Sequence, residues 1–460
     1  MNDRSDTAGA GEADDNRTHV VTAFLRNRGK LLVLRRSDAV GTYRGQWGGV
    51  SGFAEGDPDG QVRIEIREET GLTDADVSLV RTGRPLAVSD DGAREWVVHP
   101  YLFDADTRTI DLSEEHDATA WVSPTAMLSS VHPEDDRPID ETVPKLWATY
   151  ERVAPTVRSI AADDDHGAAY LSIRALEVIR DRAGLLVAER AEYGTDPAGE
   201  CAELAELASR LLEVRPAMAV LRNRVNRSMA EAAQDRDTDP DGEFGAPAVL
   251  EATLEGIDRA VDADTEAARN AADRLEGTIL TLSRSGTVLE ALEAGDPSRV
   301  YVAESRPAGE GLEVAETLID ELDCPVTVHT DAAVPAVIAR EGVDRLVVGA
   351  DTILPDGRVV NKTGTRSAAI AAAYEGVPVT VVAATDKCST RETVNLEAGS
   401  QEAIYDGDAT LDVLNPTFDV TPADCVHEIV TEDGSLEPAE ISGFVERLRA
   451  LEGWETADGR

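Results

Sequence analysis

The sequence is poor in cysteine and lysine and contains no long hydrophobic run. Its four cysteines, Cys201, Cys324, Cys388 and Cys425, lie far apart and form no CxxC pair. Neither a disulfide framework nor a zinc site is therefore indicated, and reduced thiols are expected. No apolar run approaches the ~18 residues that a membrane-spanning helix needs, and the N-terminus is polar and acidic. We therefore expect a cytoplasmic protein without a membrane partner.

Lysine is so scarce that arginine supplies almost all of the positive charge. The only lysines are Lys30, Lys145, Lys362 and Lys387, and 44 basic residues oppose 89 acidic ones, which leaves a net charge of −45. This charge repels nucleic acid, so no direct nucleic-acid binding is expected. The acids are spread along the whole chain, and the Debye length shrinks to about 3 Å in molar salt, which screens their repulsion. The composition therefore predicts a halophilic protein.

The length of 460 residues predicts about three structural units, and a hydrophobic content of 42% is ample for packed cores. Strand-like runs dominate the first third, Ala- and Leu-rich helical spacing follows, and short apolar strands then alternate with helices. Alternation of this kind indicates a parallel, Rossmann-like sheet in a multidomain α/β protein. The predicted segments are an acidic tail (1–16), a mixed α+β domain (17–150), a linker (151–166), a helical domain (167–275), a Rossmann-like domain (276–450) and a second tail (451–460). An exposed loop is predicted inside the helical domain, at 234–245.

Three glutamates, Glu65, Glu68 and Glu69, have the spacing i, i+3 and i+4 in a segment that is predicted to be helical. On a helix these carboxylates share one face, where their mutual repulsion is destabilising. A hard divalent cation such as Mg²⁺ or Mn²⁺ would compensate that repulsion. Such a cation could also bridge phosphate oxygens and support the attack of water on a diphosphate. The alternative is a solvated acidic helix face.

The residues around these glutamates favour the metal site. A Trp-Gly-Gly to Ser-Gly-Phe turn precedes the helix, and the matching core residues are Glu65, Ile66, Glu68, Glu69, Gly71 and Leu72. This segment resembles the Nudix box, and the resemblance extends over residues 17–150. It implies an α/β/α sandwich in which the three glutamates bind Mg²⁺ or Mn²⁺ and are catalytic. It also implies hydrolysis of a nucleoside diphosphate derivative at its pyrophosphate.

Two positions depart from the pattern of the Nudix box. Ile64 occupies the position of the arginine that normally orients a glutamate, and Arg63 stands one residue earlier. Asp57 falls one residue short of the usual distance from the acidic position to the core of the box. Metal binding is therefore predicted more firmly than turnover. A general base outside the box would be Glu114 or Glu115, for which the alternative is an ordinary surface acid.

A second group of polar residues follows the predicted strands of the C-terminal third. One strand runs into Ser283, Arg284, Ser285, Gly286 and Thr287, which begin a helix. Hydroxyl residues and glycine at such a turn expose backbone N–H groups, where the helix dipole favours an anion. Later strands lead into Arg306, Asp351, Asn361 and Lys362. Since the carboxyl ends of parallel strands meet at one crevice, we expect a site in which Arg306 and Lys362 bind phosphate and Asp351 lies near a sugar hydroxyl.

This run resembles the initiation factor 2B alpha/beta/delta subunit family, which includes ribose-1,5-bisphosphate and methylthioribose-1-phosphate isomerases. The resemblance covers about residues 165–450 and adds Arg215 to the candidate ligand-binding residues. It implies a dimer or larger homo-oligomer, and an isomerase site with a cysteine and an aspartate. Asp351 matches the aspartate, whereas Ser283 stands at the cysteine position. A thiol has a pKa near 8.5 and a hydroxyl is a far weaker acid, so proton transfer would suffer.

Three functions are compatible with these patterns. The leading prediction is a metal-dependent Nudix hydrolase whose C-terminal domain binds a sugar phosphate or nucleotide. The second is a non-catalytic regulatory protein resembling an initiation factor 2B subunit, favoured by Ile64 and Ser283. The third is a sugar-phosphate isomerase, which Ser283 disfavours.

Overall fold

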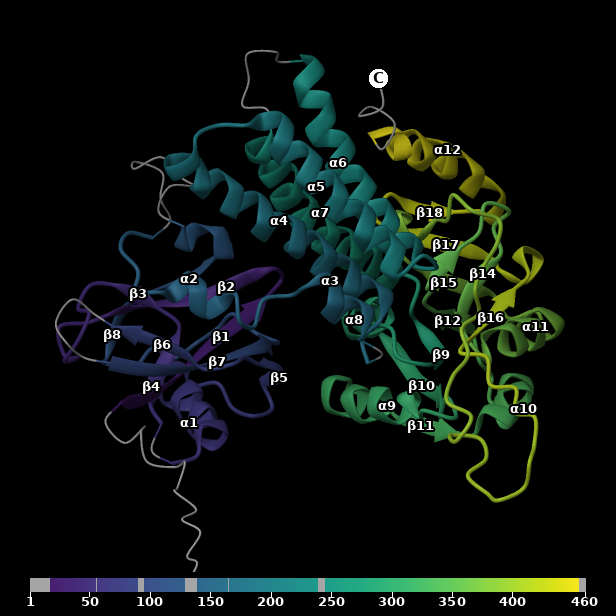
Figure 1. The fold of residues 1–460 in the computed structure, drawn as a ribbon. Coiled ribbons are helices and arrows are strands. Elements are labelled where there is room, and N and C mark those ends of the chain that lie inside the picture. Colours follow the sequence, from purple (N-terminus) through teal and green to yellow (C-terminus); the bar gives the residue numbers. More distant parts are fainter. Residues whose placement is uncertain are drawn as a thin grey trace, which may run out of the picture. The chain divides into compact units, whose positions relative to one another are not determined.

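The computed structural model packs into two compact units (Figure 1). Unit 1 contains the described residues up to Pro155 together with Asp181–Thr195, and unit 2 contains Thr156–Arg180 together with those from Asp196 onward. One helix, α4, therefore contributes residues to both units. The structure describes residues 17–54, 56–89, 95–128, 139–163, 165–238 and 245–454.

Unit 1 is built around a mixed sheet of eight described strands. The central strand β1 runs parallel to β7 and antiparallel to β2 and β4. A tight hairpin turn joins β1 and β2, with Arg28 and Gly29 both at positive φ, as a turn of this kind requires. The elements are β1 (Thr18–Asn27), β2 (Lys30–Arg36), β3 (Trp47–Gly48), β4 (Val50–Phe53), α1 (Pro58–Thr70), β5 (Val77–Thr82), β6 (Leu86–Ser89), β7 (Glu95–Ala105), β8 (His116–Val122), the 3₁₀ turn η1 (Pro124–Met127) and α2 (Leu146–Tyr150).

Helix α1 carries the three predicted glutamates and packs on one face of this sheet. Asp57 caps its N-terminus by accepting a hydrogen bond from a backbone N–H, and Gly71 ends it in the left-handed conformation. The apolar side chains of Val62 and Ile66 are buried in a core with residues of β1 and β7. Burial of these two side chains fixes the rotation of the helix, and with it the direction of the glutamates.

The helical part of unit 2 contains longer helices than the sequence pattern indicated. Helix α6 continues to Thr238, so the predicted loop at 234–245 begins too early. The segment predicted as a linker contains a short helix, α3, whose N-terminus has a capping box formed by Thr156 and Ser159. The helices are α3 (Val157–Ala161), α4 (Ala168–Tyr193), α5 (Pro197–Val214), α6 (Ala219–Thr238) and α7 (Ala246–Ala272).

The rest of unit 2 contains the predicted parallel sheet. Its strand order is β11-β10-β9-β12-β15-β17-β18, and all neighbours except the last pair are parallel. This order is that of a Rossmann fold, and its switch point lies between β9 and β12 (Figure 1). The elements are β9 (Gly277–Leu282), α8 (Gly286–Ala294), β10 (Pro297–Ala303), α9 (Glu310–Glu321), β11 (Val326–His329), α10 (Val334–Arg340), β12 (Arg345–Val348), α11 (Thr365–Glu375), β15 (Val379–Val382), the 3₁₀ turn η4 (Thr385–Lys387), β17 (Glu428–Thr431), β18 (Gly434–Leu436) and α12 (Ile441–Leu451).

A small antiparallel sheet, absent from the sequence prediction, follows β12. It has the strand order β13-β14-β16 and places Lys362 at the end of its middle strand. Its strands are β13 (Thr352–Ile353), β14 (Val359–Lys362) and β16 (Phe418–Thr421).

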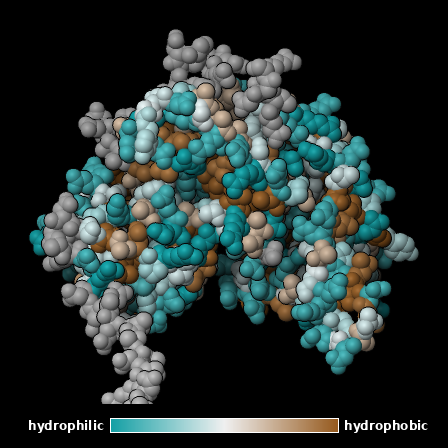
Figure 2. Space-filling view, viewed as in Figure 1, coloured by the Kyte–Doolittle hydropathy of each residue, from teal (hydrophilic) through white to brown (hydrophobic). Residues whose placement is uncertain are grey.

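The surface reflects the acidic composition. Hydrophilic residues cover most of the face shown in Figure 2, and hydrophobic ones lie there in separate groups. Within the described ranges, none of the helices combines the length and the apolar character that crossing a bilayer would require.

Candidate functional sites

The first candidate site lies where α1 meets β4. A Cβ atom added to Gly52 would lie 1.9 Å from the carboxyl carbon of Glu65, so only glycine allows this carboxylate to lie against the strand. The Nε2 atom of Gln61 donates a hydrogen bond of 2.7 Å to Glu65 Oε1. Burial raises the pKa of Glu65, and the nearby charges of Glu68 and Glu115 raise it further. Glu65 is therefore held in a defined position among other carboxylates.

Glu69 is the most deeply buried of the three glutamates, with 3% of its surface exposed. The backbone N–H of Ser51 donates to its two carboxylate oxygens at the long distances of 3.3 and 3.4 Å. His116 Nε2 lies 3.9 Å from Glu69 Oε2. Burial, followed by the charge of Glu65, raises the pKa of Glu69 well above its ordinary value. A buried carboxylate with contacts this long lacks the compensation that its ionised form needs.

The remaining predicted residues of this site are arranged unequally. Glu68 is exposed, while Glu115 is close enough to raise the pKa of both Glu65 and Glu69. Ile64 is 44% exposed, and Arg63, one residue earlier, pairs with Asp74 at 2.7 Å. Arg63 therefore does not replace the glutamate-orienting arginine of the Nudix box. Over the described residues, no group of three or more His, Cys, Asp or Glu side chains has the arrangement of a complete metal site.

The second candidate site lies at the carboxyl ends of β9, β10 and β12. Ser283 follows β9 with a φ of 63°, and Ser305 follows β10 with a φ of 61°. The backbone N–H of Ser283 donates to Ser305 Oγ at 2.7 Å, and Ser283 Oγ donates to Glu310 Oε2 at 2.7 Å. Left-handed backbone is costly for residues other than glycine and is often found at functional sites. The two adjacent strand ends are thus joined through their serines.

Lys362 and Asp351 complete this strand-end site. Lys362 Nζ lies 2.8 Å from Glu310 Oε1, which brings the lysine to the same carboxylate that Ser283 contacts. Burial raises the pKa of Asp351, and the charges of Lys387 and Lys362 oppose this shift without cancelling it. Two of the four lysines of the chain therefore act on one partly buried aspartate.

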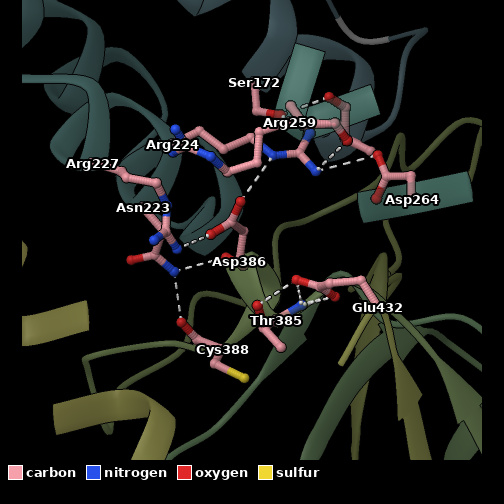
Figure 3. Close-up of polar contacts among 12 residues, drawn as sticks. Ser172, Asn223, Arg224, Arg227, Arg259, Asp264, Thr385, Asp386, Cys388 and Glu432 are labelled. Carbon is pink, nitrogen blue, oxygen red and sulfur yellow. Dashed lines mark hydrogen bonds and ion pairs between the residues drawn. The ribbon is translucent and has the colours of Figure 1, made fainter. Parts of the chain in front are cut away.

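A buried polar network anchors the turn that carries Lys387 (Figure 3). Asp386 pairs with Arg227 at 2.7 Å and with Arg224 at 3.4 Å, both from α6. Asn223 Nδ2 donates to the backbone carbonyl oxygens of Asp386 and Cys388, each at 2.7 Å. Burial acts to raise the pKa of Asp386, but the two arginines together lower it below its ordinary value. These contacts fix the backbone of η4 to the helical part of unit 2.

Several predicted ligand-binding residues have other partners. Arg215 donates to the backbone carbonyls of Ile160 and Asp163. Arg284 pairs with Glu313, and Arg306 pairs with Glu304; both arginine side chains are more than half exposed.

The other predicted residues of the strand-end site shape its backbone. Ser285 Oγ caps α8, which begins with Gly286 and buried Thr287. Asn361 Nδ2 donates to Thr365 Oγ1 at 3.0 Å. Ser283 and Lys362 therefore both contact Glu310, whose charge also acts on Asp351, while the other predicted residues contact different groups.

Three important residues were not identified from the sequence. His116 lies against Glu69, Glu310 contacts Ser283, and Asp386 pairs with arginines of α6. Glu310 stands four residues after the predicted Arg306, so its place after a strand end was a usable signal. Asp386 and His116 carried no such signal, because their partners lie far away in the sequence.

Two family models match the chain. The initiation factor 2 subunit family matches residues 164–438, and the NUDIX domain matches residues 15–144. The chain belongs to the initiation factor 2 subunit family and also contains a NUDIX domain, as the two sequence resemblances predicted.

Individual relatives agree with this assignment. A ribose 1,5-bisphosphate isomerase from Haloferax volcanii is 32% identical over 325 residues, which cover 67% of this chain and 96% of that protein. The crystal structure of the translation initiation factor eIF-2B from Pyrococcus horikoshii matches with a TM-score of 0.50 and 27% identity over 63% of this chain and 98% of that one. A 5-methylthioribose 1-phosphate isomerase from the same organism matches in fold, with a TM-score of 0.51 and 19% identity over 74% of this chain and 90% of that one. The multidomain α/β fold is confirmed, and the C-terminal part resembles sugar-phosphate isomerases.

Proposed function

We propose that the NUDIX domain is a metal-dependent hydrolase that cleaves the pyrophosphate of a nucleoside diphosphate derivative. The observation that carries this proposal is the buried Glu69 carboxylate beside Glu65 and Glu115, with only long hydrogen bonds to offset its burial. A hard divalent cation prefers carboxylate oxygens and would offset the charge of this group. The residues present therefore fit Mg²⁺ or Mn²⁺.

The residues of this site would have distinct roles. Glu65 and Glu69, held by Gln61 and Ser51, would bind the cation from the interior, and exposed Glu68 would bind it from the solvent side. When bound, the cation supplies Lewis-acid activation of a phosphate oxygen. Glu115 is the better of the two predicted bases, because its charge acts on both Glu65 and Glu69. From there it could accept a proton from the attacking water.

This function can be tested with Glu69→Gln, which keeps the shape of the side chain. The native protein should hydrolyse members of a panel of nucleoside diphosphate derivatives with Mg²⁺ or Mn²⁺ in high KCl. The rate of the variant should be lower by about 10- to 100-fold. Thermal unfolding gives a second measurement, since Mg²⁺ should raise the Tm of the native protein but not of the variant. Glu95→Gln, at an exposed glutamate of β7, is the matched control. Equal turnover by the native protein and Glu69→Gln would contradict the proposal that Glu69 binds the metal.

We further propose that the strand-end site binds a sugar phosphate or a nucleotide without isomerising it. The supporting observation is that Ser283, a hydroxyl, shares the Glu310 carboxylate with Lys362 where isomerisation would need a more acidic group. The buried thiol of Cys388 does not replace it, because burial raises the pKa of Cys388 to about 12.

An isomerase function is the second candidate, since the C-terminal part is similar to a ribose 1,5-bisphosphate isomerase. Calorimetry and an isomerase assay on pentose phosphates separate the two functions. Binding without turnover by the native protein supports a binding domain. Turnover by the native protein supports the isomerase, whereas a gain of turnover in Ser283→Cys would show that the serine alone prevents the reaction.

We also propose that the protein works as a homo-oligomer, with a dimer as the simplest form, in a salt-rich cytoplasm. The initiation factor 2 subunit family match supports the first part and the net charge of −45 supports the second. Sedimentation analysis in high KCl would give the mass of the assembly. A monomer at micromolar concentration would contradict the oligomer.

A further inference from the structure

One carboxylate contacts both Ser283 and Lys362 in the strand-end site. Glu310 accepts a hydrogen bond from Ser283 Oγ at 2.7 Å through Oε2, and pairs with Lys362 Nζ at 2.8 Å through Oε1. The side chains of Glu310 and Lys362 are each 21% exposed, so the pair is largely shielded from solvent yet open to a ligand. Lys362 already has an anionic partner in the position where a bound phosphate would be expected.

The fold holds Glu310 in this position firmly. It is the first residue of α9, where the positive end of the helix dipole stabilises a carboxylate. Gly309 precedes it in the left-handed conformation. A Cβ atom on Gly311 would lie 1.9 Å from the carbonyl oxygen of Ala303, so the helix starts in direct contact with the end of β10. Glu310 therefore cannot move away from the site by a simple shift of the helix.

We propose that Glu310 is a specificity-determining residue that competes with ligand phosphate for Lys362. Ion pairing with Glu310 offsets the charge of Lys362, and the Glu310 carboxylate would repel an incoming phosphate dianion at close range. A phosphate can pair with Lys362 only after Glu310 is displaced. The site therefore disfavours simple phosphates and favours ligands that also offer hydroxyl groups, which can donate to the Glu310 carboxylate.

This inference rests on the proposed ligand binding and is tested with Glu310→Gln. Glutamine keeps the side-chain length and can still accept a hydrogen bond from Ser283. Titration calorimetry should show about fivefold tighter binding of inorganic phosphate in the variant, the size expected for a partly exposed ion pair. The gain for ribose 5-phosphate should be smaller, because its hydroxyl groups lose a charged acceptor. Glu316→Gln removes the same charge from an exposed position of the same helix and should leave both affinities unchanged.

A second measurement tests the ion pair between Glu310 and Lys362 without a ligand. The chain has four lysines, so modification of Lys362 by an amine reagent can be followed by peptide mass spectrometry. Its rate should rise in Glu310→Gln and stay at the native level in Glu316→Gln. Native-level modification in both variants would overturn the inference.

The outcomes separate this inference from the proposed function. If the native protein binds ribose 5-phosphate and Glu310→Gln binds inorganic phosphate no more tightly than the native protein does, Glu310 does not compete with phosphate for Lys362, while the binding function stands. If neither protein binds a phosphate, the binding function is wrong and the competition falls with it.

Discussion

At the scale of single residues, a missing side chain shapes the metal-binding candidate as much as the carboxylates do. Gly52 allows Glu65 to lie against β4, since any Cβ would overlap the carboxyl group. Gly52→Ala should displace Glu65 and lower metal-dependent hydrolysis by about 100-fold, because small misplacements at reacting groups are costly. Kinetics with Mg²⁺ would measure this. Gly41→Ala, whose Cβ would meet no atom within 4 Å, should keep native activity and is the control.

The sequence predicted single residues well where their neighbours along the chain set their position. The i, i+3, i+4 spacing placed Glu65 and Glu69 together on α1, and the apolar strand pattern placed Ser283 directly after β9. It could not predict the pairing of Lys362 with Glu310, because 52 residues separate them and only the packed fold brings them together. The candidate ligand-binding roles of Arg306 and Arg215 stay predictions.

At the scale of secondary-structure elements, the turn η4 depends on the buried Asp386. Asp386→Asn should lower the free energy of unfolding by about 3 kcal/mol, because it removes the carboxylate that pairs with partly buried Arg227 and leaves buried Arg224 with the carboxylate of Asp264 alone. Urea denaturation at neutral pH would measure the loss. Asp356→Asn, which removes an exposed pair with Arg358, should cost little and is the control.

The same carboxylate gives a stability difference that depends on pH. The arginines lower the pKa of Asp386, so its contribution is complete above the ordinary value near 3.9 and is lost as pH falls through the lowered one. The difference in unfolding free energy between native protein and Asp386→Asn should therefore be constant from pH 5 to 7 and shrink below about pH 4. A difference that grows on acidification would contradict this assignment.

Elements with strong periodicity or clear ends were predicted correctly, and short ones were not. The segment around the three glutamates is helical as predicted, and it ends at Gly71, where the left-handed conformation of a glycine needs no tertiary contact. The strands of the parallel sheet were visible as apolar runs, since both faces of that sheet are covered. The two-residue strand β13 and its small sheet have too few residues for any period to be read.

At the scale of the whole molecule, the net charge of −45 opposes the compact state. Raising KCl from 0.1 M to 1 M shortens the Debye length from about 10 to about 3 Å and should screen this repulsion. We expect the Tm to rise by about 5–10 °C, which corresponds to a few kcal/mol for units of this size. Differential scanning calorimetry would measure the shift. An unchanged or lower Tm at 1 M would contradict salt adaptation.

Because helix α4 contributes to both units, it limits where the chain can be cut into separate fragments. Its second half, from Asp181 onward, belongs to unit 1, where Asp181 accepts a hydrogen bond of 2.8 Å from the hydroxyl of Tyr150, and Gly184 fits against Thr125. A fragment ended at residue 150 or 166 would lose both contacts and uncover Tyr150, which is 1% exposed. A NUDIX module that is expressed by itself should therefore run to Thr195. Helix α4 cannot be assigned as a whole to either unit.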